Sequence, residues 1–228
     1  MRASAVAAES VLEFFPALRD LGLVRHAFIG RIPGIDVALD RSAALARLDT
    51  AHHDLRNDLD LGGSRFATAE QVHGREIAVL DEPLCAGCCV AGADGLVTNQ
   101  TGISLGTYVA DCCAVFLVDP VRRCIGLVHS GKKGTELAIV VRAIETLRER
   151  FGSAPGDLVV QLGPCIRPPH YEVDFAADII RQARAAGVRQ VYDSGRCTAC
   201  DLQRYYSYRA EKARTGRMLA LLALRPFD

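Results

Sequence analysis

Residues Ile103–Glu136 read ISLGTYVADCCAVFLVDPVRRCIGLVHSGKKGTE. The apolar runs in this segment are short, rich in β-branched residues and separated by turn residues, a pattern typical of β-strands. After the glycine-flanked lysines the apolar residues recur at helical spacing as far as Phe151, which predicts a helix from about Thr135. We therefore predict three strands before this helix: Ile103–Val109, Ala114–Val118 and Cys124–Val128.

Reactive side chains collect at the ends of these predicted strands. Cys112 and Cys113 stand where the first strand leads into the second, and His129 follows the third. If the second and third strands form a hairpin, one of the two cysteines lies beside His129. Side chains alternate between the faces of a strand, so a shift of one residue in register decides which cysteine it is. The pattern alone leaves both open.

The turn after His129 carries two lysines, Lys132 and Lys133, between Gly131 and Gly134. A helix that starts here presents free backbone N–H groups and the positive end of its dipole. The turn is therefore a candidate site for an anion such as phosphate.

The composition limits the class of protein. The 228 residues are 50% hydrophobic, which is enough for one domain with a large core. Lysines plus arginines and aspartates plus glutamates each number 27, so nothing indicates nucleic acid as a partner. The chain has no apolar run of the roughly 18 residues that a membrane span needs. Nine cysteines without a disulfide-scaffold spacing, and no apolar segment typical of a signal peptide, favour a mature cytoplasmic protein.

The rest of the chain predicts one domain of mixed sheets, because hairpins outnumber β-α-β units. Arg65–Val72 and Glu76–Leu80 predict two strands that would place His73 at a hairpin tip, as a possible ligand. A helix over Ser42–Leu59 carries His52 and His53, which we expect on the surface. Further predicted elements are a strand over 26–31, short strands over 96–98, 158–162 and 188–192, a helix from Asp174 to Ala186, and a strand over 218–224.

A set of short motifs then resembles a known family. The motifs occur in the family's order from about His26 to the C-terminus: Gln71-Val72-His73-Gly74, Ala93-Asp94-Gly95-Leu96-Val97-Thr98, Ala110-Asp111-Cys112, Val128-His129-Ser130-Gly131, Gly163-Pro164, Tyr171-Glu172-Val173, Cys197-Thr198, Ser207-Tyr208-Arg209 and Thr215-Gly216-Arg217. The family is variously labelled polyphenol oxidase (laccase domain), purine nucleoside phosphorylase and peptidoglycan editing factor. The resemblance implies an α+β fold, a four-layer α-β-β-α sandwich with mixed sheets, as a single domain over residues 1–228.

The resemblance also implies a metal held by His73, Cys112 and His129, and so selects Cys112 over Cys113. Two imidazoles and one thiolate suit Zn²⁺ with a fourth position open, and copper accepts the same ligands. The implied activities are phosphorolysis of purine nucleosides, deamination of adenosine and, in older labels, copper-dependent oxidation of phenols.

Phosphorolysis requires a site for phosphate, and Arg31, Lys132 and Lys133 are the candidates on grounds of charge. Where the family usually has an aromatic residue followed by arginine, this chain has Lys132 and Lys133. Lysine keeps the charge but lacks the two-pronged hydrogen bonding of arginine.

Two other kinds of site use the same residue types. Cys112 with His129 as its base would form the nucleophile of a hydrolase or amidase, for example one acting on a peptidoglycan precursor. Cys85, Cys88, Cys197 and Cys200 form two pairs with the spacing of a structural zinc site, which would instead indicate a non-catalytic zinc-binding module. The sequence leaves the physiological substrate, the choice between zinc and copper, and the oligomeric state open.

Overall fold

The computed structural model describes residues 11–81 and 87–226, which form one α+β unit with two six-stranded mixed sheets. The first sheet has the strand order β1-β2-β12-β7-β3-β5. Its strands are β1 (Leu12–Glu13), β2 (Val24–Ile29), β3 (Arg65–Ala69), β5 (Cys88–Val90), β7 (Ile103–Val109) and β12 (Met218–Leu224). The pairs among β1, β2, β12 and β7 are antiparallel, and β3 is parallel to both its neighbours.

The second sheet has the order β11-β10-β8-β9-β6-β4, with its hairpin of β8 and β9 at the centre. Its strands are β4 (Ile77–Val79), β6 (Gly95–Thr98), β8 (Cys113–Asp119), β9 (Cys124–Ser130), β10 (Val159–Leu162) and β11 (Gln190–Asp193). Every residue of β8 and β9 is buried, because the sheet is covered on both faces. This explains why both strands read as continuous apolar runs rather than as alternating patterns.

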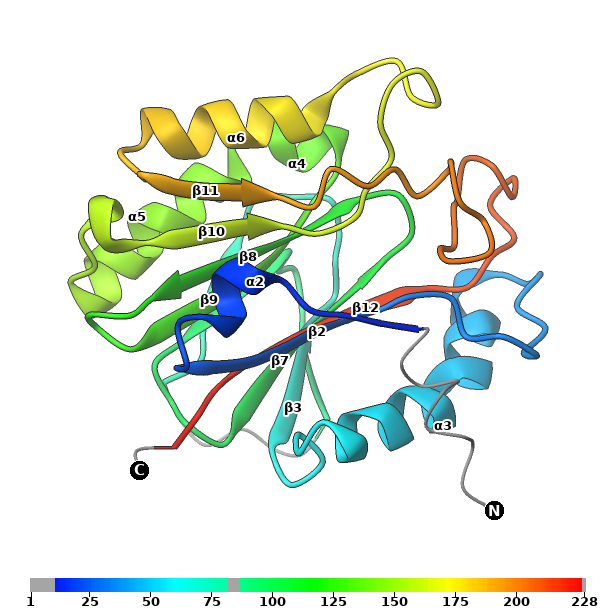
Figure 1. Ribbon diagram of the computed structural model, residues 1–228, viewed down its shortest axis with the longest axis horizontal. Helices are drawn as coiled ribbons and strands as arrows, with labels where there is room; N and C mark the ends of the chain where they lie inside the picture. The colour runs from blue at the N-terminus through cyan, green and yellow to red at the C-terminus, as the bar shows by residue number, and fades with distance from the viewer. Residues whose placement is uncertain (1–10, 82–86, 227–228) are drawn as a thin grey trace.

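The elements stack in four layers, as Figure 1 shows. The two sheets pack face to face around one apolar cluster that includes Phe28, Leu105, Phe116 and Ile125. The outer face of the second sheet is covered by the helices α4 (Lys132–Glu136), α5 (Ile139–Phe151) and α6 (Phe175–Ala185), and that of the first by α3 (Arg41–Asp58). The four-layer α-β-β-α prediction is therefore confirmed.

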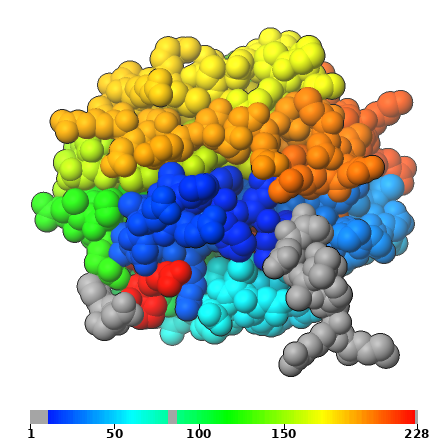
Figure 2. Space-filling view, viewed as in Figure 1, coloured from blue at the N-terminus to red at the C-terminus, as the bar shows by residue number. Residues whose placement is uncertain are grey.

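The N-terminal part of the described chain closes the seam between the sheets. Helix α2 (Pro16–Arg19) contacts β2 of the first sheet and β10 of the second. In Figure 2 this blue segment lies between the orange and yellow upper layers and the cyan segment that contains β3. The short 3₁₀ helix η1 (Pro155–Asp157) leads into β10.

The predicted central hairpin and the last strand are confirmed, whereas the helix after the hairpin differs from the prediction. Helical structure begins at Lys132, breaks after five residues, and resumes at Ile139. Ala138 has a left-handed backbone with φ of +55°, which an unbroken helix does not allow. The lysine turn is thus the first turn of a short helix, and no glycine or proline stands at Leu137 or Ala138 to mark the break.

The prediction that His73 lies at a hairpin tip is wrong. β3 belongs to the first sheet and β4 to the second, so the residues between them cross from one sheet to the other. Gln71 and His73 both have positive φ, +66° and +60°, as the chain makes this crossing. The sequence showed two extended runs around a glycine, and that pattern is the same for a hairpin and for a crossing.

The surface prediction holds for His53 but is wrong for His52, which is 1% exposed and lies 5.7 Å from the ring of Tyr108. Its burial and the nearby Arg56 lower the pKa of His52 to about 4, so the ring is neutral. The cause is visible in the sequence, because Ala44, Leu48 and His52 follow each other at steps of four and form the buried stripe of α3.

Candidate metal and active site

His73, Cys112 and His129 come together from three separate elements at one end of the sandwich. His73 lies on the crossing between the sheets, Cys112 directly precedes β8, and His129 is near the end of β9. The ligand atoms of the three side chains all lie within 4.8 Å of one another. The two imidazole rings are 4.8 Å apart at an angle of 67°. One ion could therefore contact all three side chains.

The hairpin register places Cys112, and not Cys113, beside His129. Cys113 pairs with Ser130 and Ala114 pairs with His129. The side chain of Cys113 is fully buried on the helix side of the second sheet, and its Sγ lies 3.7 Å from the carbonyl oxygen of Gly163. Cys112 instead lies beside Gly131, where an added Cβ would come within 2.6 Å of its Sγ. The geometry thus agrees with the cysteine that the family resemblance selected.

Asp94 directly precedes β6 and connects the two histidines. Its Oδ1 accepts hydrogen bonds from the backbone N–H of His73 at 2.9 Å and from Nδ1 of His129 at 3.0 Å. Its Oδ2 accepts the N–H of Gly74 at 2.6 Å. This arrangement fixes the His73 turn and leaves Nε2 of His129 free for a ligand, as is usual for metal-binding histidines. The sequence placed Asp94 in a family motif but assigned it no role.

Cys112 and His129 form a charged pair in the absence of a metal. Burial of Cys112 opposes ionisation of its thiol, but His129 and His73 outweigh it and lower the pKa of Cys112 to about 6. Burial likewise disfavours protonation of His129, but Cys112 and Asp94 raise its pKa to about 9. At neutral pH the pair is therefore a thiolate next to an imidazolium, and the thiolate is the form that binds metals and attacks electrophiles.

The residue before Cys112 keeps the cysteine in place. Asp111 has a φ of +82°, a rare value for a residue other than glycine. Its carboxylate accepts hydrogen bonds from Oγ1 of Thr198 at 2.7 Å and from the backbone N–H of Arg209 at 2.7 Å. Its carbonyl accepts the N–H of Ile166 at 2.9 Å. Three segments distant in sequence thus hold the turn that presents Cys112.

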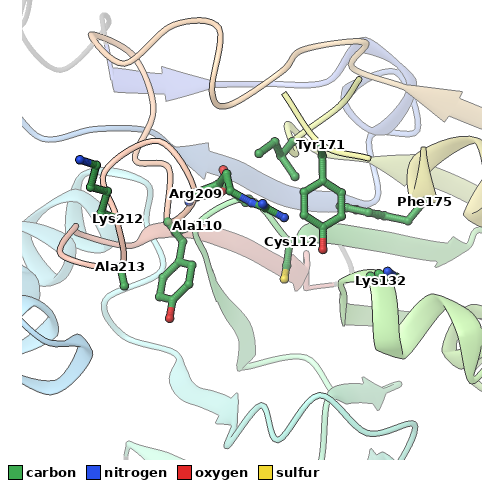
Figure 3. Close-up of a pocket in the computed structure, with 11 residues that line it drawn as sticks. Ala110, Cys112, Lys132, Tyr171, Phe175, Arg209, Lys212 and Ala213 are labelled. Atoms are coloured by element: carbon green, nitrogen blue, oxygen red, sulfur yellow. Dashed lines mark hydrogen bonds between the residues drawn. The ribbon is translucent and has the colours of Figure 1, made fainter. Parts of the chain in front are cut away.

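Two cavities meet at Cys112. The first, of about 410 Å³, is called the aromatic cavity here. It is lined by Ala110, Asp111, Cys112, Lys132, Ile166, Tyr171, Phe175, Tyr208, Arg209, Lys212 and Ala213. Figure 3 shows the sulfur of Cys112 below Arg209 and Tyr171, with Lys132 to its right. The guanidinium of Arg209 lies 4.7 Å from the centre of the Tyr171 ring.

The second, of about 400 Å³, is called the polar cavity. It is lined by Arg41, Gln71, His73, Tyr108, Ala110, Cys112, His129, Tyr208 and Arg217. Ala110, Cys112 and Tyr208 line both cavities. Two molecules or two parts of one molecule could therefore meet beside the His73–Cys112–His129 cluster.

The three predicted phosphate-binding residues lie in different surroundings. Lys132 lines the aromatic cavity, and its Nζ is 3.9 Å from Oε1 of Glu172. Lys133 is exposed and lines neither cavity. Arg31 pairs with Glu211 at 2.7 Å and lies over the ring of Tyr206, and it also lines neither cavity. Their role in phosphate binding stays a prediction.

The proposed second zinc site falls partly outside the described residues, because Cys85 does. Cys88 lies in β5 at the edge of the first sheet, whereas Cys197 pairs through its backbone with Cys165, in an isolated parallel β-bridge, next to the second sheet. Within residues 11–81 and 87–226, His73, Cys112 and His129 form the one group of three or more metal-binding side chains.

The sequence matches the family described as multi-copper polyphenol oxidoreductase laccase over residues 30–177 and 173–225. The chain belongs to this family. Among its relatives, purine nucleoside phosphorylase YlmD of Geobacillus stearothermophilus is 31% identical over 71% of this chain and 73% of that protein. A purine nucleoside phosphorylase of Deinococcus radiodurans is 30% identical over 92% of this chain and 93% of that protein.

Solved structures of this laccase family share the fold. The crystal structure of YlmD from Geobacillus stearothermophilus superimposes with a TM-score of 0.79 at 25% identity, covering 93% of this chain and 94% of that chain. Family membership and the names of the relatives support an enzyme. In the described part of the chain, none of the helices has the length and apolar character to cross a membrane.

Proposed function

We propose that this protein is a metal-dependent purine nucleoside enzyme that cleaves adenosine- and inosine-type nucleosides with phosphate and also deaminates adenosine. The observation that carries the proposal is the convergence of His73, Cys112 and His129 where two cavities meet. The relatives named purine nucleoside phosphorylases supply the substrate class. A small molecule is accordingly the expected partner.

The three side chains fit a zinc ion. Cys112 is ionised at neutral pH, and Asp94 occupies Nδ1 of His129, so each side chain offers one donor atom toward the same point. Two imidazoles and a thiolate, with a fourth position open, form a donor set typical of catalytic zinc. Copper binds the same donors, and the family description names copper. When bound, such an ion would act as a Lewis acid toward water or substrate oxygen.

Phosphorolysis forms one bond and breaks another. A phosphate oxygen bonds to C1′ of the ribose, the C1′–N9 bond breaks, and N9 keeps the electron pair. The proton that hydrogen phosphate gives up ends on the departing base, so the products are the free purine and ribose 1-phosphate. In deamination, water adds at C6 of adenosine and ammonia leaves to give inosine. Deamination therefore needs no phosphate site.

The aromatic cavity suits the purine base. Tyr171 and Phe175 pack edge to face, with ring centres 5.8 Å apart, and form an apolar wall. Aromatic walls of this kind bind flat heterocycles in a mainly apolar pocket with a few polar groups at its edge. Arg209 and Lys132 supply such groups here. A base in this cavity brings its ribose to Cys112, where the polar cavity begins.

The direct test is to incubate purified zinc-loaded protein with adenosine or inosine, with and without phosphate, and to separate the products. We expect free base and ribose 1-phosphate only when phosphate is present, and inosine from adenosine in either case. Failure to release base and to form inosine would contradict the proposal. Oxidation of phenols by copper-loaded protein, without either nucleoside reaction, would instead favour the polyphenol oxidase alternative.

One second candidate rests on a specific observation, the Cys112 thiolate beside the His129 imidazolium. The same pair is the catalytic unit of cysteine hydrolases and amidases. Metal content separates the two candidates, because a thiolate bound to zinc is not a free nucleophile. Cys112, Cys113, Cys124 and Cys165 are free thiols, and the proposal places the enzyme in the reducing cytoplasm.

The state of Cys112 gives a testable pH dependence. A pKa of about 6 means that metal-free Cys112 is protonated below pH 6 and a thiolate above it. Iodoacetamide should therefore modify Cys112 at a rate that rises through about pH 6 and then levels, and zinc should suppress it. Mass spectrometry reads each cysteine separately, and exposed Cys200, whose pKa is raised, serves as the internal control. A Cys112 profile that rises only in the alkaline range would contradict the charged pair.

A further inference from the structure

The polar cavity contains two guanidinium groups that lack acidic partners. Arg217 directly precedes β12 and is 9% exposed, and its Nη1 donates to the carbonyl oxygens of Thr215 at 3.0 Å and Gly216 at 2.9 Å. Arg41, in the first turn of α3, donates to the carbonyl of Glu70 at 3.3 Å. Within the described residues neither arginine forms an ion pair, whereas Arg31, Arg167 and Arg209 each pair with a carboxylate.

The surroundings make this arrangement costly without a ligand. Burial lowers the pKa of Arg217 and Arg41 lowers it further, while Tyr208, Cys112 and Asp111 act in the opposite direction. A buried charge without a counter-charge is destabilising, and a second like charge near it adds to the cost. The carboxylate of Asp111 relieves this cost only in part, because it forms no ion pair with Arg217 and its oxygens accept hydrogen bonds from Thr198 and from the N–H of Arg209.

Nε and Nη2 of Arg217 have no hydrogen-bond partner among the described residues, although the guanidinium lies 5.8 Å from the centre of the Tyr208 ring, and the side chain lines the cavity. The backbone carbonyls that hold Nη1 fix the orientation of the guanidinium plane. An arginine fork held in this way matches two oxygens of a tetrahedral oxyanion. Gly216 lets this backbone pass close to the Tyr206 ring, because a Cβ there would come within 2.7 Å of the ring.

We propose that Arg41 and Arg217 form the oxyanion subsite of the polar cavity and hold the phosphate that attacks the nucleoside. The proposal rests on the proposed function, since it assigns the phosphate of that reaction to named residues. The polar cavity, which would hold phosphate, and the aromatic cavity, which would hold the base, meet at Cys112 and Tyr208, which line both. The forming bond between phosphate oxygen and C1′ and the breaking C1′–N9 bond then lie beside the metal ligands.

This assignment differs from the phosphate site that the sequence predicted at Lys132 and Lys133. Lys133 is exposed and lines neither cavity, and Lys132 lies in the aromatic cavity near Glu172. Helix α4 has only five residues, so its N-terminus offers little dipole. The two arginines share the cavity of His73 and His129, whereas the lysines do not.

The first test measures phosphate binding without turnover. Inorganic phosphate should raise the melting temperature of the zinc-loaded protein, because it binds the folded state. The rise should be lost in Arg217→Gln and in Arg41→Gln, and kept in Lys133→Ala and in Arg122→Gln. Arg122 is an exposed arginine in the turn between β8 and β9, so its replacement is a control with the same change in charge. Arg41 is exposed as well, so its variant remains informative if Arg217→Gln folds poorly.

The second test measures phosphorolysis at varied phosphate. Loss of one charge-assisted arginine contact should raise the KM for phosphate by about 10–100-fold, with the KM for inosine and the zinc content unchanged. Arg217→Lys should recover part of the loss. A nucleoside 5′-monophosphate is titrated in parallel, and dependence of only this ligand on Arg217 would assign the subsite to a nucleotide and overturn the proposal.

The outcomes separate the two proposals. Phosphate binding that depends on Arg217 without any phosphorolysis would contradict the proposed function but not the subsite. Phosphorolysis with a phosphate KM that changes in Lys133→Ala and not in Arg217→Gln or Arg41→Gln would overturn the subsite but not the function. The absence of any phosphate effect on the melting temperature of the unaltered protein would also overturn the subsite.

Discussion

His129→Ala protein is expected to lose zinc and both nucleoside activities together. His129 is one of only three protein donors, and its ring also fixes the geometry toward Asp94 at 3.0 Å. Changes to the residues that merely orient a metal ligand already cost about 10–100-fold in metal affinity, so removal of a ligand should cost more. We expect zinc affinity and turnover each to fall by more than about 100-fold, measured by chelator competition and by product chromatography.

The comparison needs a variant that preserves the fold. In His129→Ala the buried carboxylate of Asp94 still accepts hydrogen bonds from the N–H groups of His73 and Gly74, so we expect this variant to fold. His129→Gln adds an amide that can still donate to Asp94 and serves as the second variant. His53→Ala, an exposed histidine on α3, is the matched control and should retain zinc and activity.

Turnover by metal-free protein is the outcome that would reverse the interpretation. If unaltered protein stripped of zinc kept its activity, and His129→Ala lost it, His129 would act as a base for Cys112 rather than as a ligand. Cys112→Ser should lose activity under either interpretation, because a serine hydroxyl is a poorer zinc ligand and a poorer nucleophile than a thiolate. The same cluster thus supports two chemistries, and only metal dependence tells them apart.

The central hairpin and the closing strand could be predicted because their information is local. Buried strands produce unbroken β-branched runs, and the turn at Asp119 and Pro120 separates two of them. Once the hairpin is known, one of Cys112 and Cys113 must lie beside His129. The register that decides between Cys112 and Cys113 depends on which face the helices cover, and a local pattern does not contain that information.

The residues that the sequence did not reveal act through contacts distant in the chain. Asp94 is 21 residues from His73 and 35 from His129, and nothing in its neighbourhood marks it as their partner. Arg217 is 176 residues from Arg41, and the two share a cavity only because β12 lies between β2 and β7. The lysine turn drew attention because its charge is visible locally. A local cluster of charge in the sequence does not by itself show that the fold forms a binding site for a charged ligand.

Asp94→Ala is expected to have the largest combined effect on stability and metal binding. The carboxylate is fully buried and accepts three hydrogen bonds, two from the backbone of the crossing segment and one from His129. Its removal leaves the N–H groups of His73 and Gly74 and the buried imidazole of His129 without this acceptor. Breaking a buried charged network of this kind costs about 3–5 kcal/mol in the free energy of unfolding.

Asp94→Asn removes the charge of the carboxylate but keeps a side chain of nearly the same size and shape. An amide has one acceptor oxygen and an NH₂ group, whereas the site presents donors to both Asp94 oxygens. The NH₂ group must therefore face at least one N–H donor, either that of Gly74 or those of His73 and His129. We expect zinc affinity to fall by about 10–100-fold, with a smaller loss of stability than in Asp94→Ala.

The measurements are urea unfolding of the metal-free variants and zinc competition with a chelator. Asp54→Asn, an exposed aspartate on α3, is the matched control and should leave both quantities unchanged. Burial acts to raise the pKa of Asp94, but His129 and the N–H groups of Gly74 and His73 lower it overall. The ionised Asp94 carboxylate therefore stabilises the folded protein at any pH above the ordinary aspartate pKa. This stabilisation is lost as the pH falls through the lower folded value. Asp94→Asn protein that bound zinc as tightly as the unaltered protein would show that His73 and His129 hold their positions without this carboxylate.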